Sequence, residues 1–239
     1  MKLIDLTFPT PAENLACEEA LLDAAESGHG GETLRFWEST TPFVVVGYAN
    51  QVDTEVNRTV CQLRRVPILR RCSGGGTVLQ GPGCLNYSLI LKIAHDGPLT
   101  SITSANRFIM EQNCTALGAL LKRPVQVSGH TDLSVDGRKF SGNSQRRRRT
   151  HLLFHGTFLL AFDLALIGEC LAMPTRQPDY RKHRKHSEFI TNIGLDAASI
   201  KAGLSRAWGA SSKDFSLPEA DISRLVNHRY GLDEWNFKF

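Results

Sequence analysis

Segments with the period-two alternation of β-strands fill the middle of this 239-residue chain, and segments with helical spacing lie on both sides of them. Leu85–Lys92 and His151–Leu160 carry the strongest strand patterns, and Asn14–Ala25 and Ser101–Leu121 carry apolar residues at helical spacing. No stretch rich in Pro, Gly or Ser divides the chain, and no repeat is present. The order of these segments predicts one α+β domain over residues 1–239, with a mixed β-sheet and flanking helices.

Shorter segments complete the expected fold. The first helix is expected to begin at Asn14 as its N-cap. The polar turn at residues 38–42 is expected to join the two strands beside it. Further strands are expected at Met1–Leu6, Leu34–Trp37, Phe43–Val46, Val66–Arg71, 124–127, 132–135 and 138–144, and further helices at 163–171, 196–209 and 216–229.

The composition excludes several classes of protein. Apolar residues make up 41% of the chain and charged residues 22%, which allows a large core and argues against disorder. The first residues lack the apolar run of a secretory signal, and His155 and Asp163 interrupt the most apolar stretch, so no membrane span is expected. The six cysteines form no C-x-x-C pair, which favours reduced thiols in the cytoplasm over a disulfide scaffold or a zinc site.

Basic residues gather in two segments, although the formal net charge is only +4. Residues 138–149 contain six basic residues and no acidic one, and residues 176–186 contain five basic residues and one acidic one. Such concentrations of charge steer anionic partners toward a surface. Few aromatic residues lie among these bases, so nucleic acid, which needs stacking platforms, is not an expected partner. A solvated surface without a partner is the alternative interpretation.

The segment Arg70–Thr77 is the first place where the sequence indicates chemistry. Its three successive glycines lack Cβ atoms, so the backbone can take positive φ and approach a ligand closely. Turns of this kind direct N–H groups into a concavity that suits phosphate or carboxylate, and Arg70 and Arg71 add cationic donors. The loop lacks the Gly-Lys-Ser/Thr ending of a Walker A loop and the spacing of a dinucleotide fingerprint. An anion site is therefore expected here, with a flexible turn as the alternative.

Later strands carry further candidate residues. Lys139 is either an inward-facing side chain that pairs with an acyl or phosphate oxygen, or an ordinary exposed strand lysine. Gly156 inside a strand marks a bulge or a close backbone approach, and its neighbour His155 is either a site residue or a core histidine. Asp132 is either a turn residue or a contact to Mg²⁺ or ribose. The residues alone leave these interpretations open.

Four motifs follow one another along most of residues 1–195, and together they resemble one family. They are Asn14-Leu15-Ala16-x-Glu18-Glu19-Ala20-Leu21-Leu22 with Leu34-Arg35-Phe36-Trp37; Arg70-Arg71-x-Ser73-Gly74-Gly75-Gly76-x-Val78 with Gly83-x-x-Asn86-Tyr87-Ser88; Asp132-Leu133 with Gly137-Arg138-Lys139-x-Ser141-Gly142-x-x-Gln145-Arg146; and His155-Gly156-Thr157-x-Leu159-Leu160. Their combination and order resemble the catalytic domain of the lipoate–protein ligase A family.

This resemblance implies the biotin/lipoate ligase fold and acyl transfer to a lysine of a small lipoyl domain, such as that of a 2-oxoacid dehydrogenase E2 subunit or a glycine cleavage H-like protein. The main expectation is the ATP-dependent reaction, in which lipoate and Mg-ATP give lipoyl-adenylate and the acceptor lysine then displaces AMP. ATP, Mg²⁺ and lipoate are therefore the implied cofactors and substrate. The basic segments are expected to face the acidic acceptor domain.

The resemblance also assigns roles to residues of this chain. Lys139 is the implied catalytic residue, which neutralises charge on the acyl-phosphate oxygens, and Asp132 is the implied contact to Mg²⁺. Tyr87, Leu85 or Phe140 is expected to line the slot for the lipoyl chain. The implied lipoate- and ATP-binding residues are Arg70, Arg71, Ser73, Gly74, Gly75, Gly76, Thr77, Val78, Leu79, Gln80, Asn86, Tyr87, Asp132, Ser141, Gly142, His155, Gly156 and Thr157.

Three departures from the family pattern keep a second reaction open. Gln80 stands where the family often has His. The sequence resembles the large domain of the ligase without the C-terminal accessory domain, so adenylation is expected to need a separate subunit unless the chain transfers a preformed acyl group. A related branch, the octanoyltransferases, uses no ATP and a cysteine nucleophile shortly before the segment that matches Asp132-Leu133.

Residues 115–169 contain no cysteine, so that nucleophile has no counterpart at the matching place in this chain. Cys72 and Cys84 flank the glycine loop and are the remaining thiol candidates, with small apolar fillers as the alternative. ATP-independent octanoyl or lipoyl transfer is thus the alternative reaction. A non-catalytic binder of lipoylated domains is the third interpretation.

Overall fold

The computed structural model describes residues 1–174, 177–212 and 216–239, and two β-sheets form its centre. The larger sheet has seven strands in the order β1-β2-β6-β10-β9-β8-β7, and the smaller sheet has three in the order β4-β3-β5. The strands are β1 (Lys2–Asp5), β2 (Thr33–Trp37), β3 (Phe43–Val46), β4 (Ile68–Arg70), β5 (Val78–Gln80), β6 (Cys84–Lys92), β7 (Gln126–Ser128), β8 (Asp132–Val135), β9 (Arg138–Arg147) and β10 (His151–Leu159).

Both sheets mix parallel and antiparallel pairs. Strands β1 and β2 are parallel, whereas the other pairs of the large sheet are antiparallel. In the small sheet β3 is parallel to β4 and antiparallel to β5. The helices are α1 (Pro11–Glu26), α2 (Val52–Glu55), α3 (Arg58–Leu63), α4 (Ile102–Leu121), α5 (Leu164–Cys170), α6 (His186–Phe189), α7 (Ala197–Ala207), α8 (Glu219–Leu225) and α9 (Asp233–Asn236), with a 3₁₀ turn at Asp179–Arg181 and a π-helical turn at Val226–Tyr230.

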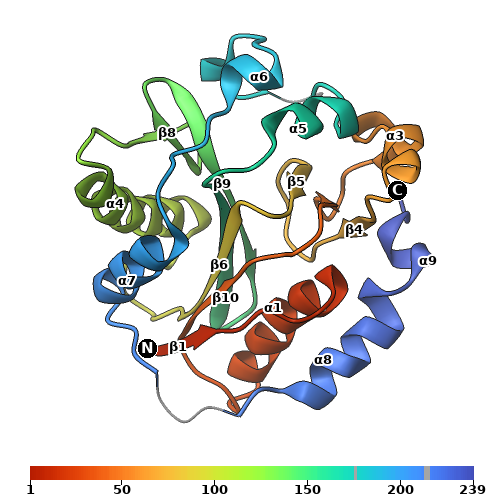
Figure 1. The fold of residues 1–239 in the computed structure, drawn as a ribbon. Helices are drawn as coiled ribbons and strands as arrows, with labels where there is room; N and C mark the ends of the chain where they lie inside the picture. Colours follow the sequence, from red (N-terminus) through yellow and green to blue (C-terminus); the bar gives the residue numbers. More distant parts are fainter. Residues whose placement is uncertain (175–176, 213–215) are drawn as a thin grey trace.

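Helices cover both faces of the large sheet (Figure 1), and this confirms the predicted α+β class with a mixed sheet. Helices α4 and α7 lie together on one face, and α1 and α8 lie on the other. The alternation along β10 sorts its side chains between these faces. Phe154 and Phe158 pack in the core under α4 and α7, whereas Leu153 packs against α1. His155 therefore points to the α1 side, where the small sheet also lies.

The first helix begins earlier than its sequence pattern predicts, because Thr10 and not Asn14 is its N-cap. Thr10 accepts the N–H of Glu13 and the Glu13 carboxylate accepts the N–H of Thr10, which makes a reciprocal capping box. Pro11 occupies the first helical position, where its missing N–H costs nothing. Asn14 lies in the first turn, and its side-chain amide donates to the carbonyls of Phe8 and Thr10.

The polar turn at residues 38–42 joins β2 to β3 as predicted, although the two strands belong to different sheets. Strand β2 pairs with β1 and β6, and β3 pairs with β4 and β5. The polar turn between them thus carries the chain from one sheet to the other. The expected helix at 216–229 is α8 followed by the π-helical turn, and Arg176 of the second basic segment lies outside the described residues. Within the described ranges, no helix is both long enough and apolar enough to cross a bilayer.

Candidate acyl-transfer site

A cavity of about 950 Å³ opens between the small sheet, helix α1 and strands β9 and β10. The glycine loop (residues 70–77), the β8–β9 hairpin and residues between α5 and α6 also contribute to its wall. Fifteen of the residues proposed from the sequence line this cavity: Arg71, Gly75, Gly76, Thr77, Val78, Leu79, Gln80, Asn86, Asp132, Lys139, Ser141, Gly142, His155, Gly156 and Thr157. Arg70, Ser73, Gly74 and Tyr87 do not line it.

Arg70 supports the fold instead of facing the cavity. Its side chain is fully buried, and its guanidinium donates to the carbonyls of Gly47, Tyr48, Asn50, Trp235 and Asn236. Its donors therefore join the start of the glycine loop to the segment between β3 and α2 and to α9, and the sequence-based assignment of Arg70 to the ligand has no support in this geometry.

Arg71 lies at the cavity and organises the glycine loop. Its Nη2 donates to the carbonyls of Gly74 at 2.6 Å and Gly76 at 2.8 Å, and Asn50 donates to the carbonyl of Gly75 at 3.0 Å. Side chains thus hold three consecutive carbonyls of the loop. Because the carbonyls are occupied, the N–H groups of the loop are the backbone groups left to bind a ligand. Such an arrangement of N–H groups binds anionic oxygens. Burial lowers the pKa of Arg71 to about 10, so its guanidinium is still charged at neutral pH.

The far side of this loop is held by a carboxylate that sequence reasoning missed. Glu55, from α2, lines the cavity and accepts hydrogen bonds from Thr77 and from Asn50, the latter at 2.8 Å. Asn50 thus connects Glu55 with the carbonyl of Gly75. This contact fixes the position of the loop relative to α2.

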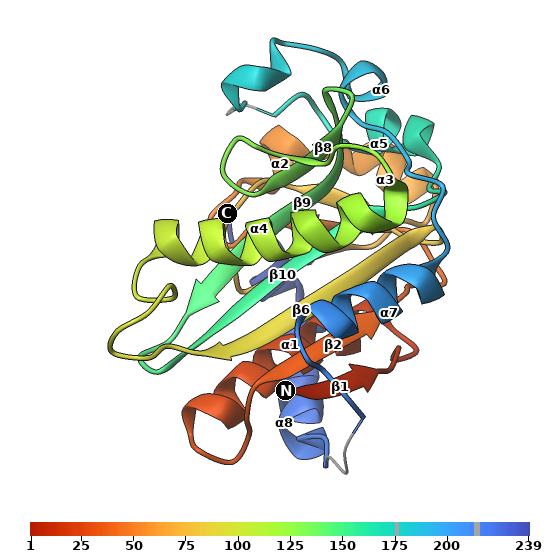
Figure 2. The ribbon, with the colours of Figure 1, turned by 90° about the vertical axis from the view of Figure 1, so that its left-hand side faces the viewer.

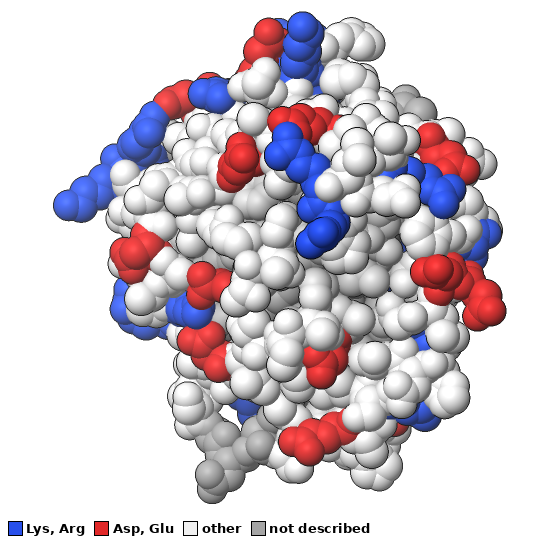
Figure 3. All heavy atoms as spheres, turned by 45° about the vertical axis from the view of Figure 1, so that its right-hand side comes forward, with Lys and Arg blue, Asp and Glu red and all other residues white. Residues whose placement is uncertain are grey.

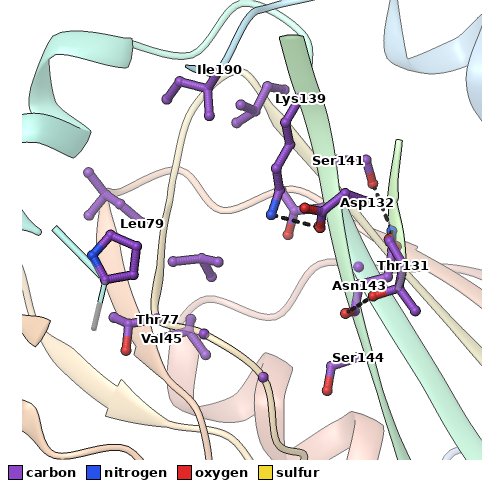
Figure 4. A pocket seen from close by; sticks show the side chains of 18 of the residues that line it. Val45, Thr77, Leu79, Thr131, Asp132, Lys139, Ser141, Asn143, Ser144 and Ile190 are labelled. Atoms are coloured by element: carbon purple, nitrogen blue, oxygen red, sulfur yellow. Dashed lines mark hydrogen bonds and ion pairs between the residues drawn. The ribbon is translucent and has the colours of Figure 1, made fainter. Parts of the chain in front are cut away.

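Lys139, near the start of β9, and Asp132, the first residue of β8, point toward one another (Figure 4). The Lys139 Nζ lies 2.8 Å from Asp132 Oδ1, and their side chains are 25% and 15% exposed. Gly142 makes room for this ammonium group, because a Cβ there would lie 2.9 Å from the Nζ. Tyr180, which the sequence did not single out, donates its hydroxyl to Asp132 Oδ2 at 2.6 Å.

The surroundings of Asp132 do not fit the expected role in binding Mg²⁺. One of its carboxylate oxygens is paired with an ammonium group and the other accepts a hydroxyl hydrogen bond. A divalent cation takes several oxygen ligands and is repelled by a neighbouring ammonium. The described residues also contain no cluster of three or more His, Cys, Asp or Glu side chains suited to a metal ion.

Apolar side chains form much of the inner end of the cavity, and buried polar side chains, among them Gln80, Asn86 and Thr157, also line the cavity. Leu15, Trp37, Val45, Val78 and Leu79 supply the apolar wall (Figure 4 labels Val45 and Leu79). Phe140 is among the lining residues, but its buried side chain packs in the same core cluster as Leu85 and Tyr87, on the opposite face of the sheet.

Two charged or titratable residues, Glu18 and His155, line the cavity and contact each other. Glu18 Oε2 lies 2.5 Å from His155 Nδ1, and its Oε1 accepts the indole N–H of Trp37 at 2.9 Å. Burial opposes ionisation of Glu18, but the hydrogen bonds from His155 and Trp37 and the charge of Arg35 outweigh it, so the pKa of Glu18 lies below its usual value. Glu18 comes from α1, and a charged residue within an otherwise apolar helix face was the signal in the sequence that would have found it.

The cysteines lie away from the cavity, and none of the six is among its lining residues. Cys72 and Cys84 are buried, and burial raises the pKa of each thiol to about 12. A nucleophilic thiol must be an accessible thiolate. Cys72 and Cys84 therefore act as small apolar residues of the core.

The two basic segments are bound to their own fold to a large extent. Arg147 donates to the carbonyl of Leu99 at 2.7 Å, and Arg148 forms an ion pair with Asp23 at 2.7 Å. Arg184, in the second segment, donates to the carbonyl of Gly137. Figure 3 shows basic and acidic side chains interspersed on one face of the molecule. Much of the charge run thus holds β9 and its neighbouring segments in place.

The second basic segment contributes cavity residues that charge counting did not identify. Tyr180, Arg181 and His186 line the cavity beside Lys139. Burial, with the charges of Arg181 and Lys139, lowers the pKa of His186 to about 4, so this imidazole is neutral at pH 7.

Comparison with known families gives the class of this protein. The model of the lipoyl protein ligase A/B catalytic domain matches residues 10–197, and the chain therefore belongs to this family. The resemblance stated from the four motifs is thereby confirmed.

Curated relatives resemble the chain over its full length. The octanoyltransferase LipM of Carboxydothermus hydrogenoformans is 29% identical over 271 residues, which cover 100% of this chain and 98% of the relative. The octanoyltransferase LipM of Halalkalibacterium halodurans is 26% identical over 272 residues, with 99% and 98% covered.

Two solved structures share the fold. A lipoate-protein ligase A bound with ATP superposes with a TM-score of 0.84 at 22% identity, covering 99% of this chain and 98% of that chain. The bi-partite lipoate protein ligase of Thermoplasma acidophilum, described with its E2 lipoyl domain, superposes with a TM-score of 0.84 at 22% identity, covering 99% and 95%. At this identity the two structures establish the fold alone.

Proposed function

We propose that this protein transfers an octanoyl or lipoyl group from an activated donor to the side-chain amine of a lysine in a lipoyl domain. The observation that carries the proposal is the position of Lys139 and the glycine loop at one cavity with an apolar inner end. The apolar end suits a medium-chain acyl tail, and the ammonium group and loop N–H groups suit the oxygens at its activated end.

The names of the curated relatives support a preformed acyl donor, the alternative reaction above, over ATP-dependent ligation. The unsuitable surroundings of Asp132 for Mg²⁺ favour the same choice. A thioester of a carrier protein is such a donor. Ligation through an adenylate is the second candidate, because the glycine loop also suits a phosphate and a structural neighbour is described with ATP.

The absence of a cavity thiol favours direct transfer. The neutral amine of the acceptor lysine attacks the carbonyl carbon of the donor thioester, the C–N bond forms, the C–S bond breaks, and the amine proton passes to the leaving sulfur. Lys139 stabilises the negative charge that develops on the carbonyl oxygen, a contribution worth about 10²- to 10³-fold in rate. Holding donor and amine together supplies much of the remaining acceleration.

The acceptor is a lipoyl domain by analogy with the Thermoplasma ligase, whose description includes such a domain. Docking of an acidic acceptor on the basic segments, a single catalytic domain over residues 1–239 and a separate accessory subunit for adenylation stay predictions.

The test compares two donors on one acceptor. A purified lipoyl domain is incubated with the protein and either an octanoyl thioester of a carrier protein without ATP, or lipoate with Mg-ATP, and its intact mass is measured. We expect acylation from the thioester, reduced about 10²- to 10³-fold by Lys139→Ala. Lys92→Ala, at the exposed end of β6, is the matched control. Acylation with Mg-ATP alone would assign the ligase reaction, and no acylation from either donor would refute the proposal.

A further inference from the structure

Four side chains from three parts of the chain form one buried hydrogen-bonded series behind the cavity. Glu18 Oε2 and His155 Nδ1 are 2.5 Å apart, and His155 Nε2 and Ser73 Oγ are also 2.5 Å apart. Arg71 Nε lies 3.0 Å from the same Ser73 Oγ. The series joins α1 to β10 and then to the glycine loop.

The groups at its two ends constrain the direction of its hydrogen bonds. At one end Glu18 is ionised, since its pKa lies below the usual value, so Oε1 accepts the indole N–H of Trp37 and Oε2 accepts from His155 Nδ1. At the other end Arg71 is a donor only, so Ser73 Oγ accepts from it. The Ser73 hydroxyl proton then needs an acceptor, and the lone pair at Nε2 of a neutral His155 ring is the one in contact with it.

We propose that Glu18 is a positioning residue that holds His155 in its neutral Nδ1–H form, and that His155 and Ser73 thereby hold Arg71 in the geometry that shapes the glycine loop. This inference deepens the proposed function, on which its kinetic part rests. Arg71 donates to the carbonyls of Gly74 and Gly76 through Nη2, and its Nε donates to both Ser73 Oγ and the Gly74 carbonyl, so Ser73 helps to orient the guanidinium. Glu18 thus acts on the loop through three other side chains and not through the acyl group.

The series has the residue types of a Ser-His-acid triad, but its burial argues against a nucleophilic serine. Ser73 is 1% exposed and does not line the cavity, whereas Glu18 and His155 do. An acyl carbonyl in the cavity would have to pass His155 to reach the Ser73 oxygen. The arrangement therefore orients groups and forms no acyl-serine.

The substitution Glu18→Gln tests the direction of the series. A glutamine offers one acceptor and one donor, so keeping the bond from Trp37 turns its NH₂ group toward His155 Nδ1. The ring must then carry its proton on Nε2 and donate to Ser73. Glu19→Gln is the matched control, because Glu19 is the next buried carboxylate of α1 and contacts Arg229 and Tyr230 instead of the series.

The readout is the ¹⁵N NMR pattern of the His155 ring at pH 7.5, together with the kcat for acyl transfer. We expect the Nδ1–H form in the wild type and in Glu19→Gln, the Nε2–H form in Glu18→Gln, and a kcat about 10- to 100-fold lower in Glu18→Gln with a KM changed less than threefold. A wild-type ring that is Nε2–H or doubly protonated would overturn the proposal, as would an unchanged ring in Glu18→Gln.

The ring spectrum needs no substrate, so it tests the series even if the transferase activity is not found. The wild-type spectrum also decides the assignment by itself if Glu18→Gln does not fold. Intact mass of the wild type after incubation with an octanoyl thioester and no acceptor tests the remaining alternative. We expect no adduct, and an octanoyl group on Ser73 would show that the series activates a nucleophile.

Discussion

Gly142→Ala is expected to disable Lys139 without removing it. An added Cβ would lie 2.9 Å from the Lys139 Nζ and 3.0 Å from its Cε. Ordinary contacts begin near 3.4 Å, so the ammonium group must move by roughly 0.5 Å or more away from the hairpin. The displaced ammonium group then loses its charge-assisted hydrogen bond to the carbonyl oxygen of the transition state. This loss raises the activation free energy by about 1.5–3 kcal/mol, which corresponds to a rate reduced about 10- to 100-fold.

The effect on stability is expected to be small, because the end of a flexible side chain can move and the Lys139–Asp132 pair is partly exposed. Such pairs contribute about 0–1 kcal/mol to the free energy of unfolding. The assay is the rate of acylation of a lipoyl domain at saturating donor, with thermal unfolding measured in parallel. Gly168→Ala in α5 is the control, since a Cβ there meets no atom within 4 Å. A Gly142→Ala rate within twofold of the wild type, while Lys139→Ala is inactive, would refute this reasoning.

Three further predictions follow from buried groups. Arg70→Leu is expected to lower the free energy of unfolding by about 3 kcal/mol or more, because five carbonyls lose a charged donor, and urea denaturation measures it. Treatment with iodoacetamide at pH 8 is expected to leave the activity unchanged, because the pKa of the Cys72 and Cys84 thiols is about 12. Peptide mass spectrometry should show both cysteines unmodified, and rapid inactivation would instead support a thiol mechanism. The folded state holds the pKa of His186 near 4, below its value near 6.5 in the unfolded chain. The contribution of this group to the free energy of unfolding is therefore present above pH 6.5 and is lost as the pH falls toward 4. His186→Gln should reduce the pH dependence of the urea midpoint between pH 6.5 and 4, and an unchanged slope would contradict the prediction.

The longer elements were predictable because apolar residues recur along them at a clear period. Strand β6 and helix α4 are examples, and each begins within a residue of its predicted start. Helices α2, α3, α6 and α9 were not predicted, because their four to six residues are too few to show a helical period, and strand β5 was not predicted either. The assignment of β2 and β3 to different sheets depends on pairing with distant strands, which a local pattern does not contain.

The cavity lining was predictable at the glycine loop and at Lys139, where unusual residues stand in motifs. The motif could not distinguish Arg70 from Arg71, because neighbouring residues of an extended chain point in opposite directions. The structure directs Arg71 to the cavity and Arg70 to α9. Glu18 and Tyr180 reach the cavity only through tertiary packing, from α1 and from the turn before α6.

The central claim is that the cavity beside Lys139 transfers a preformed acyl group to a lipoyl-domain lysine. The most direct measurement is the intact mass of a lipoyl domain after incubation with an octanoyl thioester, without ATP, using the wild type and Lys139→Ala. We expect a gain of one octanoyl group on a single lysine with the wild type, and a rate about 10²-fold lower with Lys139→Ala. No gain with the wild type, or equal gains with both proteins, would contradict it.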